Sequence, residues 1–145
     1  MSVDAHKDAI RRVLKAYGEG DVQPVLALLH RDIVWTSQAP PAMFRFGGAH
    51  NGHAEARLGI STIAADYTIH AYEVGELVGE GDVVWLTATL DVTEHKSKSR
   101  FPITLVSRWQ FRDGQVLSLT EYYDTATIAM MSGMIADRRK QAPKV

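Results

Sequence analysis

The beginning of the chain has apolar residues at helical spacing. Between Asp4 and Tyr17 they recur at intervals of three and four residues, and charged residues fill most other positions. This pattern predicts an amphipathic helix. Gly18 and Gly20 favour its end, and Asp21 can cap a second, shorter helix. Two helices in tandem are therefore expected at the start of the fold.

The next segment predicts one short strand, a loop and a third helix. Residues 33–36 are β-prone and stop before Pro40 and Pro41, which cannot continue a ladder of backbone hydrogen bonds. Residues 43–52 form a glycine-rich loop with Phe44 and Phe46 as apolar anchors, and such a loop can fold over a cavity. Residues 52–65 are compatible with a helix, which Gly59 weakens.

The rest of the chain is rich in β-forming residues. Runs at 67–78, 83–93, 100–111 and 116–123 are separated by glycine-containing turns at 79–82 and 112–115. A short helix is expected over 125–135 and a solvated tail over 138–145. Helices followed by a meander of long strands predict an α+β fold, with one domain over residues 1–145.

Composition excludes several classes of function. Sixteen basic and seventeen acidic residues give a net charge of -1, so we expect no nucleic-acid partner and no anionic membrane partner. Cysteine is absent, which removes disulfides, thiolate nucleophiles and cysteine-based metal sites. The first ten residues do not resemble a signal peptide and no stretch is long enough to span a membrane, so a cytoplasmic location is expected.

Short motifs for metals, phosphates and cofactors are also missing. The six histidines do not form HxH, HxxxH or HExxH, and there is no GxGxxG, Walker or GxSxG motif. We therefore expect no metal and no cofactor.

Several strings in the sequence carry a resemblance to a known family. They are YGEGD at 17–21, DIVW at 32–35, GEGDVV at 79–84, WQFRDGQV at 109–116 and EYYDTA at 121–126. With the order of elements, they resemble the SnoaL-like family of the nuclear transport factor 2-like, or ketosteroid isomerase-like, superfamily. The resemblance implies a cone-shaped, curved antiparallel sheet packed on N-terminal helices, described as a cystatin-like α+β barrel. It also implies a pocket between sheet and helices, and a dimer.

The resemblance does not carry over the residues of one reaction. The positions that hold the base and a second acid in ketosteroid isomerases correspond to Ser37 and Ser107, so we do not expect steroid isomerisation. Compared with limonene-type epoxide hydrolases, Asp91 and Asp124 match the carboxylates, whereas Thr89 replaces an arginine.

Three side chains are the candidates for catalysis. Asp124 is the first, as a general acid or base whose pKa an apolar setting would raise; as an alternative, it caps the last helix. Asp91 is the second, with the alternative of an outward-facing residue near Lys98 or Arg100. His53 is the third, as a proton shuttle or an ordinary surface histidine.

Strand alternation groups further residues into a candidate ligand pocket, because residues two apart face the same side. If Asp91 faces inward, Trp85 and Thr89 do so too, and an inward Asp124 implies an inward Tyr122. The candidate pocket residues are Trp35, Ser37, Phe46, Thr89, Ser107, Trp109 and Tyr122. They favour a small apolar or cyclic ligand and offer no basic cluster for a phosphate.

Two functions follow from these sequence features. The first is a cofactor-free enzyme of the isomerase, cyclase, hydratase or epoxide hydrolase type that uses acid–base chemistry in an apolar pocket. The alternative is a non-catalytic ligand-binding or dimerisation module of the same fold. A homodimer is expected through the outer face of the sheet, with Val84, Leu86, Leu117 and Leu119 as its apolar residues.

Overall fold

The computed structural model describes residues 1–140 and arranges them as helices around one sheet. Its elements are α1 (Val3–Gly18), α2 (Gln23–Leu28), β1 (Leu29–Gln38), β2 (Gly48–Asn51), α3 (His53–Asp66), β3 (Tyr67–Glu80), β4 (Val83–Glu94), β5 (Arg100–Arg112), β6 (Gln115–Tyr123), α4 (Thr125–Met131) and a 3₁₀ turn, η1 (Arg138–Lys140). The predicted order of helices first and long strands afterwards is confirmed.

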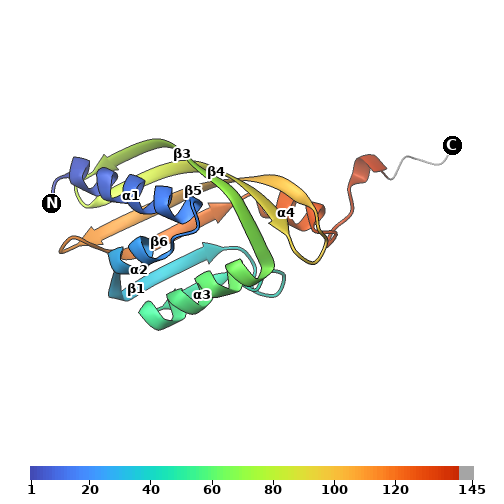
Figure 1. Cartoon of the computed structure of the whole chain (residues 1–145), viewed down its shortest axis with the longest axis horizontal. Coiled ribbons are helices and arrows are strands. Elements are labelled where there is room, and N and C mark those ends of the chain that lie inside the picture. Colours follow the sequence, from blue (N-terminus) through green and yellow to red (C-terminus); the bar gives the residue numbers. More distant parts are fainter. Residues whose placement is uncertain (141–145) are drawn as a thin grey trace.

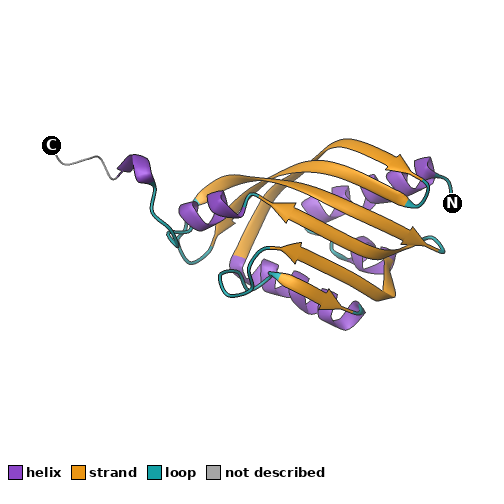
Figure 2. Ribbon diagram, turned by 180° about the vertical axis from the view of Figure 1, so that it is seen from behind, coloured by secondary structure: helices purple, strands orange, loops and turns teal. Residues whose placement is uncertain are grey.

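The six strands form one curved sheet in the order β2-β1-β6-β5-β4-β3. Strands β1 and β6 are parallel, and every other neighbouring pair is antiparallel. Helices α1, α2 and α3 lie together on one side of the sheet (Figure 1). The opposite face is largely uncovered by helices (Figure 2). This is the predicted α+β fold, with its helices segregated to one face.

Turn residues fix the two long hairpins where the sequence predicts them. Gly81 connects β3 to β4 with φ +59°, and Asp113 and Gly114 connect β5 to β6 with φ +50° and +78°. Glycine adopts positive φ without steric cost, and aspartate tolerates it better than most residues. These turns connect the strands of the meander, and the side chains of β4 and β5 alternate consistently between the two faces. In β6 a register shift near Leu117 interrupts the alternation, which resumes from Leu119.

Three elements differ from the sequence-based expectation. Strand β1 begins at Leu29 rather than at Ile33, because Leu29 still pairs with Val116 of β6 despite the polar residues that follow it. Strand β2 was expected to be loop, but its residues 48–51 pair with residues 34–37 of β1. Helix α4 ends at Met131, earlier than expected. The tail beyond Lys140 lies outside the described residues.

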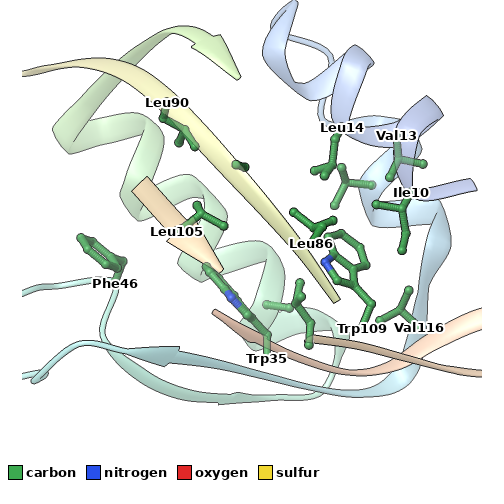
Figure 3. Close-up of a cluster of buried hydrophobic side chains, with 14 of the residues drawn as sticks. Ile10, Val13, Leu14, Trp35, Phe46, Leu86, Leu90, Leu105, Trp109 and Val116 are labelled. Atoms are coloured by element: carbon green, nitrogen blue, oxygen red, sulfur yellow. The ribbon is translucent and has the colours of Figure 1, made fainter. Parts of the chain in front are cut away.

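The inner face of the sheet and the helices enclose a single apolar core. On β5 every second residue from Phe101 to Phe111 is buried. Figure 3 shows Trp35 and Trp109 among buried side chains from helix α1 and strands β4 and β5. Burial of this apolar surface is the main stabilising term for the domain. No helix within residues 1–140 combines the length and the apolar character needed to cross a membrane.

The predicted outer apolar patch is wrong in its residues. Val84, Leu86 and Leu119 are buried on the inner face, because most apolar side chains of β4 and β6 point toward the helices. Leu117, the fourth residue of the expected patch, is half-buried. The outward parity instead exposes Trp85 by 41% and Tyr122 by 44%. The uncovered face therefore has an aromatic pair where aliphatic residues were expected.

Candidate functional site

A cavity of about 90 Å³ lies between the inner face of the sheet and the helices. Every strand except β2 contributes to its wall, as do all four α-helices and the loop before β2. Its lining residues are Leu14, Tyr17, Val25, Leu29, Trp35, Phe46, Ile60, Ile63, Tyr67, Ile69, Tyr72, Leu90, Val92, Ile103, Leu105, Trp109, Leu119, Glu121, Tyr123 and Ile128. The wall is thus apolar and aromatic except for one carboxylate and a few hydroxyl groups.

Glu121 is that carboxylate, and it lies on an interior strand of the sheet. It lies on β6, where it pairs with Ser37 of β1 on one side and with Ser107 of β5 on the other. All three side chains are buried, Glu121 to 9% exposure. The two serines stand where ketosteroid isomerases are expected to hold acids, so the single acid here lies on the strand between those two positions.

The environment of Glu121 sets two effects against each other. Burial raises the pKa of the Glu121 carboxyl group above its ordinary value, while hydrogen bonding by Trp35 and the nearby Tyr123 hydroxyl lowers that pKa. The net direction is upward. Trp35 Nε1 donates to Oε1 of Glu121 at 2.6 Å. Removal from water therefore outweighs the donors, and the protonated form is favoured more than in an exposed glutamate.

Neighbouring residues fix the position of the Trp35 side chain that makes this hydrogen bond. Its ring stacks on His50 with centroids 4.4 Å apart and planes 21° from parallel. The His50 Nε2–H group donates to the carbonyl of Phe46 at 2.9 Å. A Cβ at Gly59 of α3 would lie 2.6 Å from Cζ3 of Trp35, so the helix can approach the indole only because this residue is glycine. These contacts fix the donor that faces Glu121.

Tyrosine hydroxyls supply the other polar atoms of the cavity. Burial raises the pKa of Tyr17, Tyr72 and Tyr123, and the nearby Glu121 charge raises each further. Burial likewise raises the pKa of Tyr67 to about 12. Tyr17 and Tyr72 meet edge to face with centroids 5.8 Å apart. All four groups stay neutral at ordinary pH and can donate a hydrogen bond to a ligand oxygen.

The structure brings some of the expected pocket residues together and separates others. Trp35, Phe46 and Trp109 line the cavity. Ser37 and Ser107 are buried on the same face, although neither is part of the lining. Ser107 accepts a hydrogen bond from Trp109 Nε1 at 2.8 Å. The Ser37 hydroxyl makes no hydrogen bond of good geometry, yet it is near enough to Tyr123 to lower the pKa of that phenol slightly.

Thr89 and Tyr122 lie on the outer face, away from the cavity. Tyr122 stacks on Trp85 across the sheet with ring centroids 6.3 Å apart. Thr89 lines a shallow hollow on that face together with Asp91 and Arg100. The expected inward orientation of these residues is wrong, because they occupy the alternate positions of β4 and β6 whose side chains point away from the helices.

Asp124 is the N-cap of α4, as the capping alternative predicted. Its Oδ1 accepts from the backbone N–H of Thr127 at 3.2 Å, and its Oδ2 accepts from the Thr127 hydroxyl at 2.6 Å. These bonds lower the pKa of Asp124, the hydroxyl bond most. The expected rise of this pKa is therefore wrong, because the carboxylate is exposed and stabilised as an anion.

Asp91 and His53 also have structural partners outside the cavity. Arg100 donates to both carboxylate oxygens of Asp91, at 3.0 and 2.7 Å, and this pairing lowers the pKa of Asp91. His53 begins α3, and its Nε2–H group donates to the carbonyl of Leu26 at 2.8 Å. Neither residue faces the cavity lining.

Sequence reasoning missed Glu121, although a signal was present. Strand β6 alternates Leu119, Glu121 and Tyr123 on one parity and Ser118, Thr120 and Tyr122 on the other. The first set carries the more apolar neighbours and so predicts the buried side. Anchoring the parity on Asp124 instead assigned the wrong residues, because Asp124 stands one position beyond the strand.

The charged groups of residues 1–140 form no metal-binding cluster. Nowhere in residues 1–140 do three His, Asp or Glu side chains come together as a ligand set. The cavity lining among these residues includes no lysine, arginine or histidine, so phosphate-bearing cofactors would meet no counter-charge there.

Solved structures with the same architecture define the class of fold. A nuclear transport factor 2-like protein of unknown function from Burkholderia pseudomallei aligns with a TM-score of 0.81 and 23% identity, over 90% of this chain and 98% of that one. A protein named as a SnoaL-like polyketide cyclase from Mesorhizobium loti aligns with a TM-score of 0.69 and 17% identity, over 85% and 100%. The fold is thus nuclear transport factor 2-like.

A third structure with this fold contains a ligand. It is a ketosteroid isomerase-like protein from Catenulispora acidiphila in complex with trimethylamine, with a TM-score of 0.73 and 14% identity over 86% and 92% of the two chains. The model of the SnoaL-like domain matches residues 10–119. The chain belongs to the SnoaL-like family. No curated protein matches it significantly.

Proposed function

We propose that this chain is a cofactor-free enzyme that moves protons on a small, largely apolar molecule, with Glu121 as the proton carrier. The observation that carries the proposal is a buried carboxyl group, with a pKa raised by burial, in a cavity walled by apolar and aromatic side chains. General acid–base catalysis works best when the pKa of the catalytic group lies near the working pH. Burial moves Glu121 in that direction.

The proposed reaction also requires hydrogen-bond donors for the negative charge that develops on the substrate, and the tyrosines can supply them. When the Glu121 anion removes a proton from a carbon beside a carbonyl group, negative charge develops on the carbonyl oxygen. The neutral hydroxyl groups of Tyr17 and Tyr72 are suited to donate hydrogen bonds to that oxygen. Return of the same proton from Glu121 to another carbon completes an isomerisation. Cyclisation, dehydration and epoxide opening need the same pair of functions.

The lining also limits the substrate. Without a lysine or arginine among the described lining residues, the cavity favours neutral or weakly polar molecules over phosphorylated ones. Its volume of about 90 Å³ is below the roughly 150 Å³ of an apolar cavity that admits benzene. A ring compound therefore enters only if lining side chains move. Trimethylamine, the ligand of the Catenulispora protein, is smaller than benzene.

A proton-exchange assay tests the proposal without knowledge of the product. The protein is incubated in D₂O with a panel of small ketones and enones, and deuterium incorporation is followed by NMR. The Glu121→Gln variant should lose about 10²–10⁴-fold in exchange rate, because an amide keeps the shape and the Trp35 contact but cannot carry the proton. Asp124→Asn is the matched control and should exchange as the parent does. Equal rates in Glu121→Gln and the parent would exclude Glu121 as the carrier.

The outer face favours a second role, in dimerisation. Trp85, Val106 and Tyr122 are exposed on adjacent strands. Large exposed aromatic side chains are typical of protein–protein contacts. We propose that this face joins two copies of the chain, in addition to the chemistry of the cavity.

Sedimentation checks the dimer. The parent should sediment at about twice 16.1 kDa at micromolar concentration, and Trp85→Arg should sediment as a monomer, because a buried unpaired charge is costly. Ser61→Arg, on the exposed side of α3, is the control and should remain a dimer. A monomeric parent would remove the proposal.

A further inference from the structure

The charged lining of the cavity is acidic and has no basic partner among the described residues. Among the described residues that line it, Glu121 is the only carboxylate, and no basic side chain accompanies it. The titratable groups that face Glu121 are phenols: Tyr17 from α1, Tyr72 from β3 and Tyr123 from β6. A buried acid normally has a counter-charge or gives up its own charge. Here none of the described lining residues supplies a positive charge.

The hydrogen bonds at Glu121 are nevertheless those that an anion needs. The indole N–H of Trp35 can only donate, and its distance of 2.6 Å to Oε1 is at the short end that is typical of ionised acceptors. The Tyr123 hydroxyl acts in the same direction on the carboxylate. His50 does not bind Glu121, because its Nε2–H group donates to the carbonyl of Phe46 and its ring stacks on Trp35. The site therefore offers donors to an ionised Glu121, and its described lining residues include no cation to offset the cost of burial.

Aromatic rings make up much of the remaining wall. The aromatic lining residues are Tyr17, Trp35, Phe46, Tyr67, Tyr72, Trp109 and Tyr123. The face of an aromatic ring attracts a cation, most strongly where water is excluded, and cages of such rings recognise methylated ammonium groups. An apolar wall alone could use leucine and isoleucine, so the aromatic lining adds a preference for positive charge.

We propose that the cavity binds a small methylated amine in its ammonium form, with the N–H group toward Glu121 and the methyl groups against the aromatic rings. The inference rests on the proposed function because it concerns the ligand of the same cavity. A cavity of about 90 Å³ suits a molecule smaller than benzene. The bound ammonium ion favours the ionised form of Glu121, so where Glu121 is protonated its proton leaves for solvent and the charge is balanced.

Two probes of similar size and different charge separate this inference from simple apolar binding. Trimethylammonium, added as its chloride at neutral pH, is compared with neutral tert-butanol by isothermal titration calorimetry. The parent should bind trimethylammonium at least about tenfold more tightly, as expected from one desolvated cation–π contact. Repeating the titration at pH 4.5, where an acid with a pKa above 4.5 is mostly protonated, in two buffers of different ionisation heat should reveal proton release with trimethylammonium and none with tert-butanol.

Two variants test whether Glu121 is the residue that causes the preference for trimethylammonium. Glu121→Gln, which keeps an acceptor for the Trp35 N–H group, should lose the preference for trimethylammonium and its proton release while still binding tert-butanol. Glu73→Gln, the same chemical change at an exposed position of β3, should behave as the parent. Circular dichroism in the near ultraviolet confirms that each variant is folded.

The possible outcomes are distinct. Equal or tighter binding of tert-butanol by the parent would overturn the amine inference, whereas the proton-exchange assay would still judge the enzyme proposal. Unchanged trimethylammonium binding in Glu121→Gln would overturn it also. Failure of the parent to bind either probe would overturn it as well. Loss of exchange in Glu121→Gln together with any of these results would leave the acid–base function intact.

Discussion

Carboxyl groups inside and outside the cavity have pKa values shifted in opposite directions. On the inner face, burial raises the pKa of Glu121. On the outer face and at the end of β6, hydrogen bonds from Arg100 and Thr127 lower the pKa of Asp91 and Asp124. The type of residue therefore says little about its chemistry. What decides is whether donors or desolvation dominate its surroundings.

The largest expected effect comes from truncating the inner face. Leu105 of β5 is buried beside the cavity and its neighbour Thr104 is exposed on the other face. Leu105→Ala should reduce the free energy of unfolding by about 2–5 kcal/mol, because it removes buried carbon atoms and enlarges the cavity. Thr104→Ala should change it by less than about 0.5 kcal/mol. Urea denaturation measures both free energies of unfolding. Equal losses in the two variants would contradict the assignment of Leu105 to the buried face and Thr104 to the exposed face.

The next effect is on how stability depends on pH. The folded protein binds the Glu121 proton more tightly than the unfolded chain does. The stabilising contribution is therefore complete below the ordinary value of 4.5 and is lost as the pH rises through the folded-state pKa. Glu121→Gln removes this loss, so its stability should fall less than that of the parent from pH 4.5 toward neutrality. Parallel profiles for the two proteins would contradict burial of a titrating acid.

Asp124 should show the reverse dependence. Its folded-state pKa is lowered, so its contribution is present above the ordinary value of 3.8 and is lost as the pH falls through the folded-state pKa. Asp124→Asn should therefore lose less stability in acid than the parent does. Denaturation at a series of pH values checks the sign, and a loss on the alkaline side instead would contradict it.

The smallest effect concerns Asp124 as a helix cap. Asp124→Asn should be close to neutral near pH 7, because asparagine caps as well as aspartate, whereas Asp124→Ala should cost about 0.5–2 kcal/mol. Thermal denaturation compares them. Equal destabilisation by both variants would mean that the charge, rather than the capping oxygen, is what α4 requires.

The sequence predicts the fold much better than the site, and particular elements show why. Helix α1 and the hairpin turns at Gly81 and Gly114 depend on local periodicity and backbone preference, which a sequence displays directly. Strand β2 was missed because residues 48–51 have no β-forming pattern, and it exists through its pairing with β1. Long-range pairing of this kind leaves no local signal.

The site depended on a choice of parity that chemistry alone could not make. Asp91 and Asp124 looked suitable because they are acids, but the alternation of apolar residues on β4 decides which side is buried, and Asp91 lies on the other side. Glu121 shares its parity with Leu119 and Tyr123. The meeting of β6 with Trp35 of β1, 86 residues away, could not be read from either strand by itself.

Burial raises the pKa of Glu121, whereas hydrogen bonds lower the pKa of Asp91 and Asp124 outside the cavity. The most direct measurement is an NMR titration of the side-chain carboxyl carbons in ¹³C-labelled protein, which reports Glu121, Asp91 and Asp124 in one sample. We expect a midpoint for Glu121 above 4.5 and midpoints for the two aspartates below 3.8. Trp35→Phe should raise the Glu121 midpoint further, because the anion loses its indole donor. A Glu121 midpoint at or below 4.5 in the parent protein would contradict the account.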